Sequence, residues 1–119
     1  MSQRSFLPRS EAVREARQFG SDAFVDWGFD LAEGVLILSE LAANAVVHGR
    51  SPFSVILKRT DHHVLIEVSD KSPEWPVLRP ASDDEGGRGL AIVTRVARSW
   101  GCLPDLHGGK TVWAEVAVR

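Results

Sequence analysis

The chain has 119 residues, of which 44% are hydrophobic and 25% are charged, as in an ordinary globular domain rather than a disordered or membrane-embedded one. A formal net charge of −2 without a basic stripe argues against nucleic acid as a partner. The sequence shows neither an export signal after Met1 nor an uninterrupted apolar span, and its single cysteine, Cys102, fits a reducing compartment. We therefore expect one cytoplasmic domain over residues 1–119, without membrane contact.

The first half of the sequence predicts a short strand followed by two helices. A strand is expected over residues 5–7, and helical spacing of apolar residues predicts a helix from Ser10 to Gly28. From Leu31 to Val47 nearly every residue favours a helix or a core. The pair Asp30 and Glu33 resembles a capping box, and Gly49 supplies a stop signal. The second helix should be largely buried.

The second half predicts a hairpin, a loop, a helix and a closing strand. Two β-rich runs over residues 53–57 and 64–68 flank a polar turn, which indicates an antiparallel hairpin. Residues 69–89 are rich in proline, glycine and acidic side chains and read as a loop. A third helix is expected from Leu90 to Trp100, followed by a final strand over residues 112–118 or by a hairpin that contains it. This order predicts an α+β fold, a two-layer α/β sandwich.

On one face of the second predicted helix, polar residues interrupt the otherwise apolar sequence. Glu40 and Asn44 are four residues apart and therefore share a direction, and His48 continues the line by another turn. Because their neighbours in the helix are apolar, Glu40 and Asn44 should border a cleft or be buried with partners. A carboxylate beside an amide suits Mg²⁺ and proton abstraction, but a structural hydrogen-bonded pair explains this helix about equally well.

Two further segments have the composition of ligand-binding turns. Asp70 stands at the end of a predicted strand before Ser72 and Pro73, although a turn-forming aspartate is the commoner explanation of this pattern. Residues 87–90 lead into the third predicted helix, where free N–H groups would favour a phosphate. A flexible glycine-rich loop remains the competing interpretation there.

Better-known nucleotide signatures are excluded by their spacing. Gly109, Lys110 and Thr111 imitate the end of a P-loop, but Pro104 occupies the earlier glycine position and a strand follows. A dinucleotide fingerprint would need glycine where Ile92 stands. Neither a Walker site nor a Rossmann site is expected.

Taken in order, four motifs resemble those of the Bergerat-fold (GHKL) ATPases, the superfamily of gyrase, the heat-shock chaperone, histidine kinases and MutL. The motifs are ELAANAVVHG over residues 40–49, VSDKSPEWP over 68–76, GGRGLAIV over 86–93 and GKTVWAEV over 109–116. Within the superfamily, the Ser-Pro form of the second motif and the short length resemble the small actinomycete anti-sigma factor serine/threonine kinases. The resemblance covers about residues 9–118. It implies a mixed, mostly antiparallel sheet covered on one face by three helices.

The resemblance also implies ATP and Mg²⁺ as cofactors and a role for each matching residue. Glu40 would be the general base, Asn44 a Mg²⁺ ligand, and His48 would approach the phosphates. The phosphates would also be cradled by four residues at a helix start, namely Gly87, Arg88, Gly89 and Leu90.

For the adenine base, the resemblance implies a pocket shaped by Ser72 and Pro73. Asp70 would accept a hydrogen bond from the adenine amino group, with Thr111 in support. Many relatives carry Asp-x-Gly-x-Gly at this turn, so this chain departs from the commoner pattern.

The function implied is that of an anti-sigma factor that phosphorylates an antagonist protein on serine or threonine and sequesters a sigma factor. The resemblance suggests a homodimer. Retention of Glu40 favours a kinase, whereas the altered Asp70 turn leaves open a non-catalytic ATP-binding module that controls a partner. A detached histidine-kinase catalytic domain is disfavoured by the Ser-Pro turn and by the lack of a dimerisation helix carrying a phospho-acceptor histidine.

Overall fold

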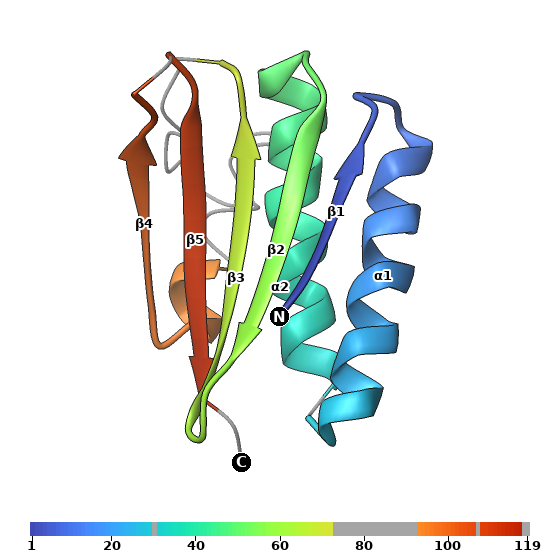
Figure 1. Ribbon diagram of the computed structural model, residues 1–119, viewed down its shortest axis with the longest axis vertical. Helices are drawn as coiled ribbons and strands as arrows, with labels where there is room; N and C mark the ends of the chain where they lie inside the picture. The colour runs from blue at the N-terminus through green and yellow to red at the C-terminus, as the bar shows by residue number, and fades with distance from the viewer. Residues whose placement is uncertain (30, 73–92, 107, 118–119) are drawn as a thin grey trace.

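The computed structural model describes residues 1–29, 31–72, 93–106 and 108–117, and every structural statement below refers to these ranges. A five-stranded sheet in the order β1-β2-β3-β5-β4 has helices packed on one face, so the expected two-layer sandwich is confirmed (Figure 1). Each described strand pairing is antiparallel. The elements are β1 (Ser2–Phe6), α1 (Glu11–Trp27), α2 (Leu31–Asn44), the π-helical turn η1 (Ala45–Gly49), β2 (Phe53–Arg59), β3 (His63–Asp70), β4 (Ser99–Pro104) and β5 (Lys110–Ala117). Within these ranges, none of the helices combines the length and the apolar character needed to cross a bilayer.

Helix α1 forms where the spacing of small and aromatic residues predicts it. Ala12, Ala16, Ala23 and Phe24 are buried along one face, as the three- and four-residue spacing of a helix requires. The helix ends at Gly28, whose φ of 66° and N–H bond to the carbonyl of Val25 form a left-handed cap. The predicted end of the first helix is therefore confirmed.

The second predicted helix is confirmed in position but changes its hydrogen-bonding pattern. Helix α2 ends at Asn44, and the next five residues form the wider π-helical turn η1. The left-handed residue that closes this turn is Arg50, with φ 51°, so the expectation that Gly49 would be the stop is wrong by one residue. Single π turns are frequent at functional sites, and this one begins directly after Asn44.

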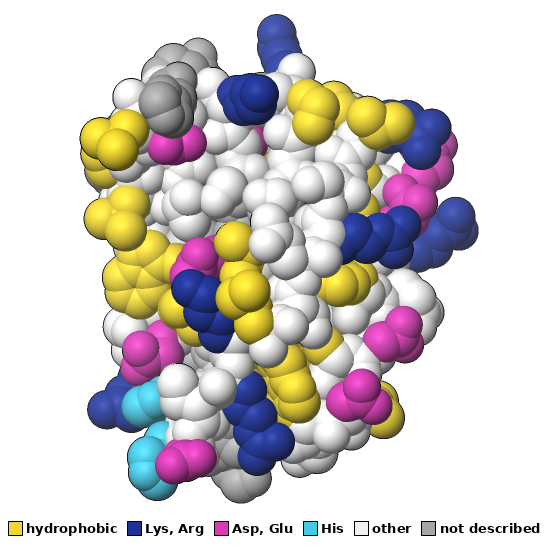
Figure 2. All heavy atoms as spheres, viewed as in Figure 1, with side chains coloured by type: hydrophobic (Ala, Val, Ile, Leu, Met, Phe, Trp, Pro, Cys, Tyr) yellow, Lys and Arg dark blue, Asp and Glu magenta, His cyan; other side chains and the backbone are white. Residues whose placement is uncertain are grey.

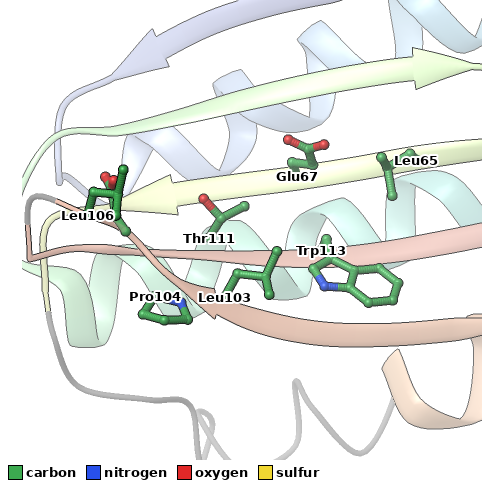
Figure 3. Close-up of a pocket in the computed structure, with 8 residues that line it drawn as sticks. Leu65, Glu67, Leu103, Pro104, Leu106, Thr111 and Trp113 are labelled. Atoms are coloured by element: carbon green, nitrogen blue, oxygen red, sulfur yellow. The ribbon is translucent and has the colours of Figure 1, made fainter.

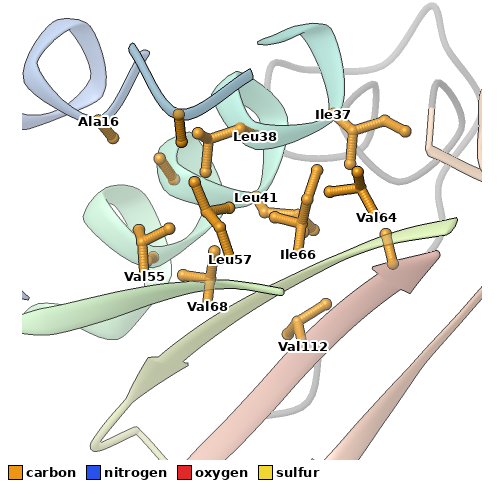
Figure 4. Close-up of a cluster of buried hydrophobic side chains, with 14 of the residues drawn as sticks. Ala16, Ile37, Leu38, Leu41, Val55, Leu57, Val64, Ile66, Val68 and Val112 are labelled. Atoms are coloured by element: carbon orange, nitrogen blue, oxygen red, sulfur yellow. The ribbon is translucent and has the colours of Figure 1, made fainter. Parts of the chain in front are cut away.

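The sheet buries one face against the helices. Strands β2, β3 and β5 alternate buried and partly exposed residues, which confirms the predicted hairpin and closing strand. Figure 4 shows Leu38 and Leu41 of α2 against valine, leucine and isoleucine side chains of these strands. This continuous core fixes the distance between α2 and the ends of β3 and β5, and so positions the site described below.

The third predicted helix differs from the structure at its C-terminal end. Residues 93–96 are helical, whereas Trp100, where this helix was expected to end, belongs to the edge strand β4. In β4, Gly101 lies directly opposite Trp113, and a Cβ atom on Gly101 would come within 2.9 Å of the indole ring. Gly101 thus makes room for the aromatic ring of Trp113 on the neighbouring strand. Most of the predicted loop and the start of this helix lie outside the described residues.

Candidate functional site

A buried ion pair joins the end of β3 to the start of β5. Asp70 and Lys110 lie directly opposite each other in the ladder, on the sheet face that the helices cover. The Lys110 ammonium donates to Asp70 Oδ1 at 2.9 Å and to Oδ2 at 3.1 Å. Only 5% of the lysine side chain and 4% of the aspartate side chain are exposed. Both charges are therefore removed from water and held by each other.

The chain around this pair is tightly constrained. The backbone N–H of Ser72 donates to Asp70 Oδ1 at 2.9 Å, which is the aspartate-centred turn that an Asp-x-Ser sequence favours. The Ser72 carbonyl accepts from Lys110 at 3.4 Å. At Gly109 a Cβ atom would lie 2.2 Å from the carbonyl oxygen of Asp70, so only glycine fits beside that strand end. The orientation of the Asp70 carboxylate is thus set by its neighbours before any ligand arrives.

Helix α2 brings an amide to the same place. Asn44 and His48 line a cavity of about 20 Å³ whose other polar members are Asp70 and Lys110. Asn44 is 9% exposed, and its Nδ2 is buried without a hydrogen-bond partner in the described part of the chain. Buried amides are normally satisfied, so this one has donor capacity to offer a ligand. A cavity of this size holds about one water, so a nucleotide base requires its walls to separate on binding.

Glu40 lies one helical turn before Asn44, as the spacing predicts. It is half-buried in α2 and is engaged in contacts of its own. The structure therefore brings Asn44, His48 and Asp70 to one cavity, with Ser72 hydrogen-bonded to Asp70, and it places Glu40 outside the lining of that cavity. The remaining residues of the implied adenine pocket and phosphate cradle lie outside the described residues, namely Pro73, Gly87, Arg88, Gly89 and Leu90.

Thr111, which the resemblance places in support of Asp70, points to the opposite face of the sheet. Its hydroxyl is 2.6 Å from that of Ser69, its partner across the β3–β5 ladder. Successive residues of a strand face opposite sides, so the neighbour that does reach Asp70 is Lys110. The structure does not bring Thr111 to the carboxylate.

A larger hollow, of about 570 Å³, lies on the sheet face that carries no helix. Figure 2 shows apolar side chains gathered on this face over β4 and β5, next to charged ones. Figure 3 shows Leu65, Leu103 and Trp113 around the hollow. Of its two carboxylates, Glu67 and Asp105, Glu67 is paired with Lys58 at 3.3 Å. Size alone would favour this hollow, but apart from Thr111 it contains none of the residues predicted to bind a nucleotide.

Burial and both charges of the buried ion pair affect the pKa of the Cys102 thiol in β4. Partial burial raises the pKa of the Cys102 thiol above its ordinary value. The positive charge of Lys110 opposes this rise, and the negative charge of Asp70 adds to it. Cys102 itself does not line the cavity.

The donor set fits a nucleotide. A buried carboxylate can accept from the amino group of a base, and the Asn44 amide can present its oxygen to a cation or its NH₂ to a phosphate. The carboxylate and the amide lie between a helix and two strand ends of a two-layer sandwich. This arrangement has the chemistry of a nucleotide-binding domain. The chain belongs to the histidine kinase-like ATPase domain family, which it matches over residues 6–114.

Three matches to known proteins extend this result. The chain is 32% identical over 90 residues to the signal transduction histidine-protein kinase AfsQ2 of Streptomyces coelicolor. This match covers 63% of this chain and 15% of that protein. Its fold resembles the crystal structure of the RsbU and RsbW domains of Rv1364c from Mycobacterium tuberculosis, with a TM-score of 0.69 at 20% identity, over 100% of this chain and 33% of that one. A histidine kinase, AdeS of Acinetobacter baumannii, matches at a TM-score of 0.55 and 11% identity, over 100% of this chain and 68% of that one. The two solved structures show the shared fold.

Family membership confirms the resemblance to the Bergerat-fold ATPases and implies an ATP-binding domain. Sequence reasoning missed Lys110 and Gly109 as parts of the site. A signal for Lys110 was present, because it continues the alternation of Val112, Ala114 and Val116 and so falls on the buried face. A lysine on a buried face needs a counter-charge, and Asp70 provides it.

Proposed function

We propose that this domain binds Mg-ATP and transfers a phosphoryl group to serine or threonine on an anti-sigma factor antagonist, and that it sequesters a sigma factor by direct contact. The observation that carries the proposal is the cavity shared by Asn44 and Asp70, in which an amide without a partner among the described residues stands beside a buried carboxylate. The motif resemblance to anti-sigma factor kinases and the fold likeness to the RsbW domain support the regulatory part.

Asp70 is assigned to binding of the adenine base, and Asn44 is assigned to binding of Mg²⁺. The Asp70 carboxylate, oriented by the Ser72 N–H, accepts from the adenine amino group. The Asn44 amide oxygen is a suitable ligand for Mg²⁺, a cation that keeps most of its remaining positions for water and phosphate oxygens. His48 is exposed at the end of η1, where it can approach the phosphates.

Glu40 is assigned to proton transfer. ATP supplies the γ-phosphoryl group and Mg²⁺ neutralises its developing charge. The acceptor hydroxyl oxygen forms a bond to the γ-phosphorus while the bond to the β-γ bridging oxygen breaks, which leaves ADP. Glu40 takes the hydroxyl proton. This role needs a carboxylate one turn from the metal ligand, which is the spacing that α2 provides.

The test combines γ-labelled ATP, Mg²⁺ and candidate antagonist proteins with two variants of α2. We expect acid-stable label on a serine or threonine with the wild type, and a loss of roughly 10²- to 10⁴-fold in rate for Glu40→Gln. ATP affinity should stay within about twofold, because a base acts mainly in the transition state. Glu33→Gln, in the first turn of the same helix, is the matched control and should transfer normally.

Three results would count against parts of the proposal. Tight ATP binding without transfer to any antagonist would favour a non-catalytic module in which ATP sets the shape that a partner recognises. Acid-labile label would indicate a phosphohistidine, as expected of a detached histidine-kinase domain. Transfer by Glu40→Gln at the wild-type rate would remove Glu40 from the mechanism.

A further inference from the structure

Lys110 occupies a buried position in β5 at which a hydrophobic residue would pack equally well. Its strand neighbours on the same face are Val112 and Ala114, both buried, and the lysine itself is 5% exposed. Removing an ammonium and a carboxylate from water costs several kcal/mol per ion, and well-packed apolar residues often replace buried pairs without loss of stability. The ion pair is therefore poorly explained by folding alone, and its place in the cavity wall beside Asn44 suggests a ligand.

The hydrogen bonds of the pair leave one donor and one acceptor weakly used. The Lys110 ammonium has three donors, of which two make the 2.9 and 3.1 Å contacts with Asp70 and the third reaches the Ser72 carbonyl at 3.4 Å. Asp70 Oδ1 accepts from both Ser72 and Lys110, whereas Oδ2, within the described ranges, accepts from Lys110. A ligand can thus take the third Lys110 donor and a free lone pair of Oδ2 together.

We propose that Lys110 and Asp70 read two adjacent positions on the edge of the adenine base, with Lys110 donating to ring nitrogen N1 while Asp70 accepts from the 6-amino group. The inference rests on the assignment of Asp70 to adenine in the proposed function. Adenine presents a donor next to an acceptor on this edge, which complements the acceptor and donor of the pair. Guanine in the same orientation presents a carbonyl to Asp70 and an N–H to Lys110, so both contacts become repulsive.

Nucleotide binding to the wild type and to variants of the pair tests this inference. Calorimetry with Mg²⁺ would compare ATP, GTP and 1-deaza-ATP, which keeps the amino group but replaces N1 by C–H. A hydrogen bond to a charged donor corresponds to roughly ten- to a hundredfold in affinity, so the wild type should bind 1-deaza-ATP weaker than ATP by that ratio. In Lys110→Met the ratio should fall to about one, because the donor that senses N1 is gone.

Control variants separate this contact from general damage. Lys58→Met removes the lysine of the exposed Lys58–Glu67 pair and should keep the wild-type ratio. Lys110→Met leaves Asp70 buried without its counter-charge, so the double variant Asp70→Asn with Lys110→Met provides a form in which neither charge is buried alone. It too should show a ratio of about one. The wild-type comparison of ATP with 1-deaza-ATP needs no variant, and equal affinities would overturn the contact even if Lys110→Met fails to fold; the double variant then assigns the donor.

The outcomes distinguish this inference from the kinase assignment. Equal affinity of the wild type for ATP and 1-deaza-ATP overturns the N1 contact while leaving ATP binding intact, as does an unchanged ratio in a folded Lys110→Met protein. A third outcome is a protein that shows the expected affinity ratio, and loses it in Lys110→Met, without transferring phosphate to any antagonist. That result would support the contact between Lys110 and N1 and would contradict the proposed kinase activity. Absence of ATP binding rejects both.

Discussion

Replacing Asn44 by alanine should stabilise the free protein and weaken its response to ATP. In the free protein the Asn44 Nδ2 group is buried without a partner among the described residues, and such a donor costs about 1–3 kcal/mol. Alanine removes this cost and favours a helix, but it loses the packing of the carboxamide group, which we set equal to that of one methylene, about 0.8 kcal/mol. The net expectation is a gain of about 1 kcal/mol.

Thermal unfolding can measure both effects. For a chain of 119 residues the entropy of unfolding is about 0.25 kcal/mol per kelvin, so a gain of about 1 kcal/mol raises Tm by about 4 °C. ATP with Mg²⁺ at a hundred times its Kd should stabilise the wild type by about 2.7 kcal/mol, which is about 10 °C. In Asn44→Ala this shift should shrink by half or more, and EDTA should shrink the wild-type shift similarly.

Thr60→Val serves as the control, because it removes hydrogen bonds in the hairpin turn at the other end of β3. It should lower Tm by about 4 °C and leave the ATP shift intact. A lower Tm for free Asn44→Ala, or a full ATP shift in that variant, would refute the reasoning and make Asn44 a structural residue. An absent ATP shift in the wild type would remove the proposed function at its first step.

Three further predictions concern the buried pair. Gly109→Ala should lower the free energy of unfolding by about 2–4 kcal/mol in urea titrations, because its Cβ would lie 2.2 Å from the Asp70 carbonyl; an effect below about 1 kcal/mol would contradict the close approach. Lys110→Met should cost about 3 kcal/mol, against less than about 1 for the exposed Lys58→Met, and equal costs would show that the pair is not buried in solution. Iodoacetamide should alkylate Cys102 slowly at pH 7 and faster only as pH rises towards its raised pKa. Lys110→Met should slow alkylation further, because the cation that lowers this pKa is lost; faster alkylation of the folded variant would contradict the sign.

The elements that the sequence predicts well have strong local patterns. Helix α2 combines an apolar face with good helix formers, and the β2–β3 hairpin alternates clearly around a polar turn. The range of strand β4 was not predicted because Gly101 and Pro104 are poor strand formers, and an edge strand tolerates them through pairing with β5 alone. The π turn η1 was missed because a shift in hydrogen-bond partner has no signature in residue propensity.

Sequence spacing predicts which candidate residues share a helix face, but it does not predict which strand residues contact them. Glu40, Asn44 and His48 follow helical spacing, and a helix keeps them together whatever the rest of the chain does. The contact between Asp70 and Lys110 depends on the register of two strands 40 positions apart in the chain. Such a register is settled by packing of the whole sheet, so only the buried position of Lys110 could be inferred beforehand.

The β3–β5 ladder also bears on how this domain can diversify. It holds Asp70 and Lys110 together through direct strand pairing, and the chain between them returns to the core at Val93, which is fully buried. The strand pairing itself, and not the connection between Ser72 and Val93, therefore sets the distance between the two charged groups. The orientation of Asp70 can therefore persist while substitutions on surfaces away from this ladder adapt the domain to new partner proteins.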